Sequence, residues 1–425
     1  MNLTLPYTPR RWQATAHKSI DAVRFAVLVW HRRAGKTVAC INELIKGTVR
    51  CPYPNARGIY VAPFLKQAKK VAWQYLLDYT APIPGVRYNK SDLSATFPNG
   101  AVVYLGGADN PDSLRGIHLD FAVLDEYAQM SPMMWTSVLR PALSDRKGKA
   151  IMIGTPQGRN SFYKMYKQAG ELDGWYANYL PVTDTDCIDA AELLALQREM
   201  PPDEYEREYL LNWDASIQGA FFGSEMQDAH SQGRITSVPY ESGLPVVSAW
   251  DLGIRNSVVW LFQIAGTEVR VIDCRFYEGT SLEAICRDLD KLPYIWNRHI
   301  LPHDVRVREF GTGRTRLEMM QTLGMDVQIA KNLPELDGIE AARRLIERCW
   351  FDADACELGI EALTQFRTEY DPTRQSFKLR PLEDWTNHFA DAFRYFAIEN
   401  GGVQMDMQLG WRDPIDYGGR NASIT

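Results

Sequence analysis

The chain has 425 residues, of which 45% are hydrophobic and 24% are charged, and its formal net charge is -6. This length exceeds that of one ordinary domain and predicts two, each with a full-sized core. The mildly acidic balance excludes a surface that coats nucleic acid throughout, because Lys and Arg carry phosphate contacts. Any contact with DNA is therefore expected to be local, for example at the arginine-rich loop VRVREFGTGRTR, residues 305–316.

Membrane spans, secretion signals and disulfide frameworks are not indicated. No run approaches the roughly 18 consecutive apolar residues of a membrane helix, and the start, MNLTLPYTPRRWQ, lacks a basic-then-apolar layout. The seven cysteines include no CxxC pair, so reduced thiols fit better than disulfides or a zinc site. We expect a soluble intracellular protein with no membrane partner.

Residues 25–30, FAVLVW, predict a buried strand, and KTVACINELIKG soon after it predicts a helix. The stretch between them ends like a phosphate-binding loop, but Trp30 stands where the pattern GxxxxGK[ST] opens with glycine. In this context Gly35 lets the backbone turn its N–H groups toward phosphate, Lys36 supplies charge to the β and γ phosphates, and the Thr37 hydroxyl can bind Mg²⁺. The pattern alone leaves a chance match open.

Support comes from FAVLDEYAQM, residues 121–130, which predicts a buried strand ending in Asp125 and Glu126. Paired acids at the carboxyl end of a strand suit ATP hydrolysis. Asp125 would hold Mg²⁺ through water, and Glu126 would orient or deprotonate the attacking water. The alternative, a strand that ends in a solvated acidic turn, is disfavoured by the phosphate loop about 90 residues upstream.

Two further strands follow the same order, GIYVAP at 58–63 and AIMIGTPQG at 150–158, and each leads into a helical stretch. Strands that alternate with helices predict a parallel sheet, with its ligand at the carboxyl ends of the strands. Thr155, Gln157 and Gly158 would lie where a loop can sense the γ phosphate. A plain tight turn remains the alternative for these residues.

The ordered set PRRWQ, WHRRAGKT, LRGIHLDFAVLDE and IGTPQG resembles the ATPase half of the large terminase subunit of tailed bacteriophages, the motor that pumps viral DNA into a preformed capsid. Members of that family often replace the leading glycine of the loop and carry arginine within it. The resemblance implies an α/β fold whose N-terminal domain, residues 1–215, is a P-loop, RecA/helicase-like parallel-sheet ATPase. It also implies a lid subdomain at about 165–215.

The same resemblance implies roles for further residues. Gln13 would read adenine, and Thr155 would belong to the coupling motif. Arg115 in SLRG resembles the arginine that is offered in trans to the ATP of a neighbouring subunit, while Arg32 or Arg33 could act in cis. An arginine beside the γ phosphate stabilises the charge that develops in the transition state. The choice among these arginines stays open, as does an ordinary surface role for Arg115.

In the second half, a composition rich in Gly, Ser and Pro predicts a linker at 216–240, and the following stretch reads as three strands joined by turns. Asp251 closes the first strand, Asp304 ends a later apolar run, and Asp391 lies on a C-terminal helix. Converging carboxylates repel one another unless cations neutralise them. Two divalent metal ions, Mg²⁺ or Mn²⁺, are the usual device for in-line phosphodiester cleavage.

Two stripes are predicted on the last helix. The core-facing stripe is Trp385, Phe389, Ala392 and Phe396, and the stripe beside it is Asp384, His388, Asp391 and Tyr395. The pattern HFADAFRY resembles the final nuclease motif of terminases, whose nuclease half has an RNase H-like fold with a mixed sheet. Asp251 and Asp304 match the first two acids of that family.

The resemblance implies a nuclease domain at 241–400, in which His388 and Asp391 bind metal together with Asp251 and Asp304. A purely structural role stays open, more so for His388 than for Asp391. Asp273 lies on a neighbouring strand, where an acid at a strand end is commonly solvated. Residues 401–425 are polar and lack a core pattern, so we expect a flexible tail or a docking segment there.

Together the two halves predict a large terminase subunit. Its activities would be ATP-driven translocation of double-stranded DNA into the procapsid and metal-dependent endonucleolytic cutting of the concatemeric genome. The resemblance further implies a homo-oligomeric ring of five, a portal protein, a small terminase subunit, and the host cytoplasm as location. The alternatives are a helicase-like, DNA-remodelling ATPase with a non-cutting RNase H-like scaffold, and a scaffold that binds the portal without catalysis.

Overall fold

The computed structural model describes residues 5–215, 217–253, 255–306, 314–371 and 376–400. The chain divides into two compact units, Met1–Gln218 and Gly219–Thr425. Within the described ranges, no helix has both the length and the apolar character needed to cross a membrane.

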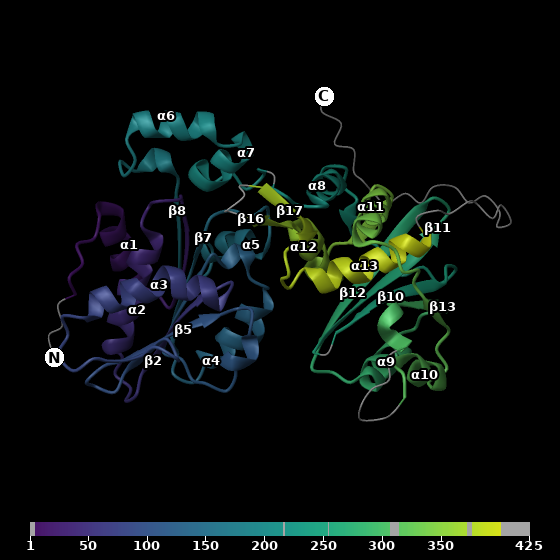
Figure 1. The fold of residues 1–425 in the computed structure, drawn as a ribbon, viewed down its shortest axis with the longest axis horizontal. Coiled ribbons are helices and arrows are strands. Elements are labelled where there is room, and N and C mark those ends of the chain that lie inside the picture. Colours follow the sequence, from purple (N-terminus) through teal and green to yellow (C-terminus); the bar gives the residue numbers. More distant parts are fainter. Residues whose placement is uncertain (1–4, 216, 254, 307–313, 372–375, 401–425) are drawn as a thin grey trace. The chain divides into compact units, whose positions relative to one another are not determined.

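The first unit is built on an eight-stranded sheet with the order β3-β4-β5-β2-β6-β7-β1-β8 (Figure 1). From β5 to β8 all neighbours pair in parallel, while β3 and β4 add an antiparallel edge. The predicted parallel sheet is confirmed. Its strands are β1 (Phe25–Trp30), β2 (Arg57–Ala62), β3 (Arg87–Asn89), β4 (Ser94–Thr96), β5 (Val102–Gly107), β6 (Phe121–Asp125), β7 (Lys149–Gly154) and β8 (Trp175–Leu180).

Helices cover both faces of this sheet, which is why its central strands are apolar without interruption. All six residues of β1 are buried. Ala26, Leu28 and Trp30 face the core beneath α1 (Arg11–Ala22), α2 (Lys36–Val49) and α3 (Leu65–Thr80). The alternate residues of β1 face the second core. That core is covered by η1 (Pro111–Leu114), η2 (Tyr127–Gln129), η3 (Met134–Leu139), α4 (Arg140–Ala142) and α5 (Ser161–Ala169).

The chain leaves the sheet after β8 and forms the lid, which is η4 (Val182–Asp184), α6 (Ala190–Glu199), α7 (Pro202–Tyr205) and η5 (Glu206–Leu210). In the lid, α6 ends before Pro201 and Pro202, and α7, which begins at Pro202, and η5 follow. In Figure 1, α6 and α7 lie beyond the end of β8, away from α2 and α3. The lid has a small core of its own around Val182, Tyr205 and Tyr209. Because β8 pairs with β1, the lid begins after Leu180 and not at about residue 165.

The second unit contains a seven-stranded mixed sheet with the order β14-β13-β10-β11-β12-β15-β9. The strands β10, β11 and β12 form an antiparallel meander, and the other neighbours pair in parallel. This confirms the predicted strand-turn-strand-turn-strand and the mixed sheet of an RNase H-like fold. The strands are β9 (Ile235–Thr236), β10 (Val246–Leu252), β11 (Asn256–Ala265), β12 (Glu268–Glu278), β13 (Trp296–Leu301), β14 (Val327–Ile329) and β15 (Cys349–Asp352).

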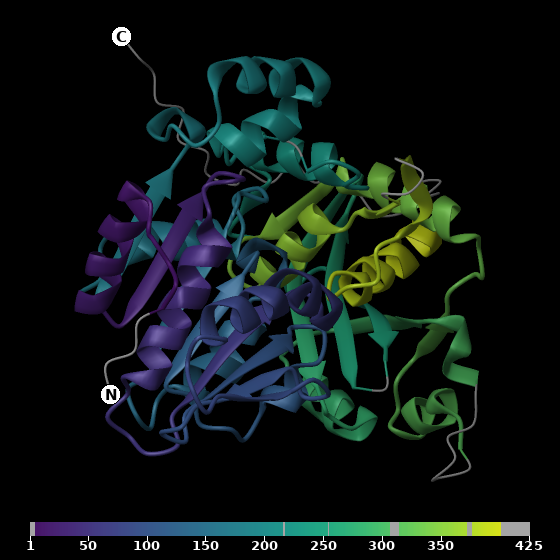
Figure 2. The ribbon, with the colours of Figure 1, turned by 60° about the vertical axis from the view of Figure 1, so that its left-hand side comes forward.

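Helices also pack on both faces of the second sheet. One face carries α8 (Gly223–Ser231), α11 (Glu335–Ile346), α12 (Glu357–Gln365) and α13 (Asn387–Asn400). The other carries α9 (Leu282–Asp290) and α10 (Arg316–Thr322). Figure 2 shows α13 lying along the strands of this unit. The buried Phe389, Ala392 and Phe396 confirm its core-facing stripe, and the Phe396 ring stacks on Phe262 with centroids 3.7 Å apart. The remaining elements are η6 (His303–Arg306), β16 (Thr368–Asp371) and β17 (Ser376–Pro381).

Two sequence predictions are wrong in this unit. The segment 216–240 is not a plain linker, because α8 buries Met226 and β9 pairs with β15. The last helix begins at Asn387, so Asp384 and Trp385 precede it, although Trp385 still packs against the core as predicted. The Asp384 carboxylate accepts the backbone N–H of Thr386 at 2.9 Å, a local hydrogen bond that competes with helix formation. The predicted tail, 401–425, lies outside the described residues.

Candidate nucleotide and nuclease sites

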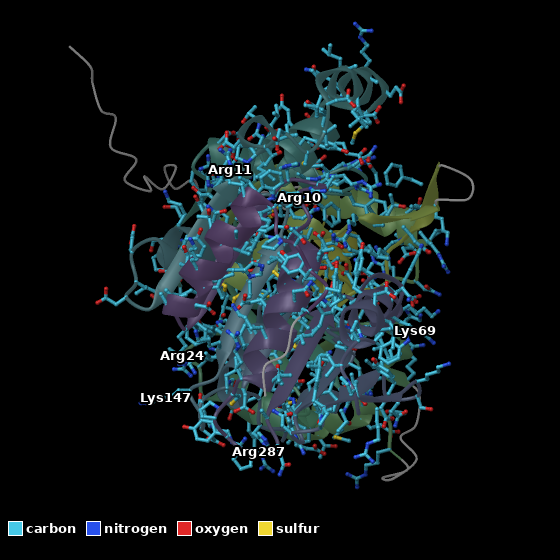
Figure 3. The ribbon with its side chains drawn as sticks, turned by 90° about the vertical axis from the view of Figure 1, so that its left-hand side faces the viewer. Arg10, Arg11, Arg24, Lys69, Lys147 and Arg287 are labelled. Carbon is cyan, nitrogen blue, oxygen red and sulfur yellow. The ribbon has the colours of Figure 1, made fainter. Side chains whose placement is uncertain are left out.

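The phosphate loop between β1 and α2 is held from outside by the first turn of α1. The Trp12 indole N–H donates to the carbonyl of Ala34, and the Gln13 amide N–H donates to that of Gly35, both at 2.9 Å. Arg10, at the start of α1 in Figure 3, donates to the carbonyl of Arg33 at 3.3 Å. With these carbonyls engaged on one side, the loop is free to present N–H groups on the other, as an anion site requires.

Two residues of the loop have left-handed backbone conformations, Arg33 with φ 74° and Gly35 with φ 81°. A Cβ atom on Gly35 would lie 2.6 Å from Nε2 of Gln13, so glycine is required there by both backbone and space. Trp30 explains the missing first glycine of the pattern. It is still in β1, is fully buried, and donates its indole N–H to Asn178 on β8 at 2.6 Å. The turn begins after it.

Four predicted residues converge at the carboxyl ends of β1 and β6. The Lys36 ammonium lies 3.5 Å from Oε1 of Glu126, and the Thr37 hydroxyl donates to Oδ2 of Asp125 at 3.1 Å. A residue that sequence reasoning missed completes the group, because the buried Tyr60 hydroxyl of β2 donates to the same Asp125 oxygen. The two hydroxyl donors give the buried Asp125 carboxylate the partners that a buried charge needs.

The electrostatics of this group suit phosphate and a cation. Burial and the neighbouring Glu126 raise the pKa of Asp125 to about 6, against the opposing effects of Lys36 and the two hydroxyls. Burial lowers the pKa of Lys36, but the carboxylates of Glu126, Asp125 and Glu208 outweigh burial and leave it raised. A carboxylate and a hydroxyl at one point are the oxygen donors that Mg²⁺ prefers, so these residues fit the ion.

The loop after β7 meets the lid at this site through Glu208, which sequence reasoning also missed. The hydroxyl of Thr155 donates to Oε1 of Glu208 at 3.3 Å, and the Arg32 guanidinium lies 3.9 Å from Oε2. The backbone N–H of Arg32 donates to the Glu208 carbonyl at 2.8 Å. Burial and Glu126 raise the pKa of Glu208. Of the predicted cis arginines, Arg32 thus lies near the lid carboxylate, and the side chains of both Arg32 and Arg33 are exposed.

Arg115 lies at the end of η1, on the same unit. Its guanidinium is 3.0 Å from Oδ1 of Asp112, and 42% of its side chain is exposed. A partly exposed arginine that pairs with Asp112 is compatible with both open interpretations, a group offered to a neighbouring subunit and an ordinary surface residue.

In the second unit, the end of β10 meets the first half of α13. The His388 Nδ1 lies 2.7 Å from Oδ2 of Asp251, and this hydrogen bond raises the pKa of His388 against the effect of burial. Burial raises the pKa of Asp391 to about 6, the Arg394 guanidinium 3.0 Å away opposes this, and Asp251 adds to it. Three predicted residues, Asp251, His388 and Asp391, are thus neighbours.

The fourth predicted acid, Asp304, lies in η6, three residues beyond the end of β13; its side chain is outside the described residues. In the described part of the chain, no group of three or more His, Cys, Asp and Glu side chains is arranged to hold a metal ion. The carboxylates of Asp251 and Asp391 are nevertheless the oxygen donors that Mg²⁺ and Mn²⁺ prefer. Asp273 is paired with Arg275 at 2.8 Å. Residues 307–313 of the predicted DNA-contacting loop also lie outside the described residues.

The missed residues differ in the signal they leave in the sequence. Arg394 stands three positions after Asp391, where an ion pair on a helix is expected. Tyr60 is the polar residue in the apolar run GIYVA, and a buried tyrosine needs a hydrogen-bond acceptor. Glu208 could not be singled out from the sequence, because PPDEYEREYLLNW contains several acidic residues and no pattern distinguishes one of them.

Comparisons with known proteins agree with this geometry. A family model described as the N-terminal part of the T4likevirus-type terminase large subunit matches residues 31–228. The terminase large subunit of Thermus phage G20c is 30% identical over 190 residues, which is 40% of this chain and 37% of the relative. The terminase large subunit of Escherichia phage T5 is 21% identical over 399 residues, 89% of this chain and 87% of the relative.

Among solved structures, the large terminase of bacteriophage HK97 is 12% identical with a TM-score of 0.47. The match covers 94% of this chain and 96% of that chain. This chain spans little more than a third of the length of the Thermus phage relative and most of that of the phage T5 relative. The family match includes the phosphate loop, the acidic strand end and the lid. Residues 31–228 of this chain are thus similar to the N-terminal part of large terminase subunits, and most of the chain is similar to the phage T5 relative.

Proposed function

We propose that this protein is a viral DNA-packaging motor and nuclease. It would couple ATP hydrolysis to translocation of double-stranded DNA into a procapsid, and it would cut the concatemeric genome with divalent metal ions. The observation that carries the proposal is the convergence of Lys36, Thr37, Asp125 and Glu126 on one sheet edge, with a separate cluster of Asp251, His388 and Asp391.

In the motor unit, Lys36 and the loop N–H groups would bind the β and γ phosphates, and Gln13 would contact the adenine. Thr37 and Asp125 would hold Mg²⁺, which when bound neutralises phosphate charge. Glu126 would orient the attacking water and accept its proton. Its ion pair with Lys36 at 3.5 Å supports this role, because it places a carboxylate next to the γ-phosphate ligand. Thr155 would pass the loss of that phosphate to the lid, and Arg115, Arg32 or Arg33 would stabilise the transition state.

In the nuclease unit, Asp251, Asp304 and Asp391 would hold two divalent ions, which when bound activate water and stabilise the departing oxygen. His388 would bind one ion or orient Asp251. The hydrogen bond of His388 to Asp251 supports the second role, since a partner that fixes a carboxylate is a common feature of metal sites. The pair Arg394 and Asp391 would likewise orient the third acid.

The proposed partners are those that the resemblance to large terminase subunits implies. We propose that the protein acts as a ring on the portal of the procapsid in the host cytoplasm, with a small terminase subunit that selects the DNA. A ring of five is the form that the resemblance implies. Mixing Arg115→Ala protein with Lys36→Ala protein, each inactive alone, tests the shared site. An arginine offered in trans restores part of the ATP turnover, because an intact phosphate loop can then meet the intact Arg115 of a neighbour, whereas an arginine acting within its own subunit restores none.

The motor assignment is tested with Lys36→Ala and Glu126→Ala in the full chain. DNA-stimulated ATP turnover should fall on the order of a hundredfold or more, as when a charge-stabilising group is lost from an active site. Lys69→Ala is the matched control, because Lys69 is an exposed lysine on α3 of the same unit. Nicking of plasmid with Mn²⁺ should remain in both site variants. Full ATP turnover in either one contradicts the assignment.

The nuclease assignment is tested with Asp251→Asn and Asp391→Asn, using supercoiled plasmid and Mn²⁺ without ATP. Both variants should lose cleavage, and a chelator should abolish it in the wild type. Asp290→Asn, at the exposed end of α9, should cut normally. If the folded wild-type protein leaves the plasmid intact while it hydrolyses ATP, the non-cutting scaffold alternative replaces the nuclease.

A further inference from the structure

The lid reaches the nucleotide site at one acidic side chain, Glu208 of η5. Its carboxylate accepts the Thr155 hydroxyl at 3.3 Å and lies 3.9 Å from Arg32 and 3.6 Å from Arg207. The side chain is largely buried, with 12% of it exposed. Lys36 is also among the charges that act on Glu208. A carboxylate of the lid therefore interacts with the cations of the phosphate loop.

This arrangement conflicts with a bound triphosphate. ATP brings several negative charges to Lys36 and the loop, and Glu126 already acts on Glu208 as a like charge. In a site of low dielectric, the attraction between Glu208 and the loop cations would be replaced by repulsion from phosphate. A carboxylate without its cation partners is costly to keep buried. Glu208 therefore has a reason to leave when the γ phosphate arrives.

Glu208 cannot leave alone, because its neighbours tie η5 to the rest of the lid and to β8. The rings of Tyr205 and Tyr209 stack with centroids 5.3 Å apart and form the lid core. At the other end, the Tyr179 hydroxyl of β8 bonds to the carbonyls of Leu210 and Leu211 at 3.0 and 2.8 Å. The Glu208 carbonyl also accepts the N–H of Arg32. A displacement of Glu208 is thus transmitted to the lid and to the loop.

We propose that Glu208 is an electrostatic latch, a positioning residue that holds the lid on the empty phosphate loop and that the γ phosphate displaces. This inference rests on the proposed ATPase function. The latch competes with the nucleotide, so it lowers the affinity for triphosphate more than that for diphosphate. It links the phosphate at Lys36 to the lid through Thr155, Arg32 and η5, with no further group needed.

The test compares binding of AMP-PNP·Mg²⁺ and ADP·Mg²⁺ to the full chain by calorimetry. Glu208→Gln removes the charge and keeps the shape, so it should tighten AMP-PNP binding by about tenfold, the order expected for one partly screened charge pair. ADP binding should tighten less. Glu208→Asp keeps the negative charge, so its affinities for AMP-PNP and ADP should lie close to those of the wild type. Asp214→Asn is the control, because Asp214 joins the lid end to Arg159 by a largely exposed ion pair and should leave the ratio unchanged.

Hydrogen exchange of peptides from 205–212 gives a second readout that simple destabilisation would not reproduce. In the wild type, AMP-PNP should speed exchange there and ADP should not; in Glu208→Gln, exchange should be fast with either nucleotide. Unchanged or weaker AMP-PNP binding by a folded Glu208→Gln protein overturns the latch. If the wild-type protein binds neither nucleotide, the proposed ATPase function fails and the latch fails with it. If the wild type binds and hydrolyses ATP but the variant behaves identically, only the latch fails.

Discussion

The contact between Gln13 and Gly35 makes a quantitative prediction. Gly35→Ala places a methyl group in a left-handed conformation, which costs about 1–2 kcal/mol. The same methyl would lie 2.6 Å from Nε2 of Gln13, so the side chain must move and lose its hydrogen bond to the Gly35 carbonyl. That loss adds about 0.5–1.5 kcal/mol. We expect a total destabilisation of about 1.5–3.5 kcal/mol.

In a domain of this size, each kcal/mol lowers the melting temperature by about 2–4 °C. Thermal unfolding of the first unit, followed by circular dichroism, should therefore shift by about 3–14 °C in Gly35→Ala. In the Gln13→Ala background the collision is absent. Gly35→Ala should then cost only the backbone part, about 1–2 kcal/mol.

The double-mutant cycle separates the two contributions, since neighbouring residues show a coupling energy and independent ones do not. If Gly35→Ala lowers the free energy of unfolding equally in the wild type and in the Gln13→Ala background, the contact with Gln13 is not the reason for the glycine. Nucleotide binding is a further check. Gln13→Ala alone should weaken ATP-analogue binding while it leaves plasmid cleavage unchanged, because the loop loses one of its supports in the motor unit only.

Three further predictions concern single residues. Burial lowers the pKa of His299 from 6.5 to about 4, so between these pH values the unfolded chain binds a proton that the native state does not. The free energy of unfolding should therefore fall by about 3 kcal/mol between pH 6.5 and 4. Urea titrations of His299→Gln should lack this part of the pH dependence. Tyr60→Phe removes a hydrogen-bond donor to Asp125 and should raise the Mg²⁺ concentration for half-maximal ATPase activity about tenfold. An unchanged Mg²⁺ concentration would contradict this role of Tyr60. Gly359→Ala would place Cβ 2.3 Å from Trp260 and should destabilise the second unit by about 1–3 kcal/mol, whereas Gly170→Ala, whose Cβ meets only a carbonyl at 3.5 Å, should melt like the wild type.

The sequence predicted those parts of the site that depend on chain order. Asp125 and Glu126 follow an apolar run, and Lys36 and Thr37 open a helix, so both pairs could be placed on one sheet edge before any coordinates were known. Tyr60 and Glu208 could not be placed, because their contacts depend on how separate strands and the lid meet. Neither residue belongs to a local pattern with a defined partner.

Errors of the sequence prediction arose where local hydrogen bonds or pairing overrode composition. The period of the last helix extended back to Asp384, but the carboxylate of that residue bonds the backbone two positions on and delays the helix start. The segment 216–240 is polar in overall composition and was therefore predicted as a linker, although its Phe222 and Met226 are buried in the core of the second unit. A few apolar side chains in a polar segment suffice to attach it to a sheet.

The position of β8 at the end of the strand order has a mechanical consequence. Five of its six residues are only partly buried, and it is bonded to the sheet through β1. The lid is therefore suspended from the border of the sheet, whereas the phosphate loop extends from an interior strand packed on both sides. The phosphate loop is thus held in place by the sheet, while the lid can move about its attachment at β8. Substitutions that stiffen the outer side of β8 should slow the movement of the lid without altering the affinity for nucleotide.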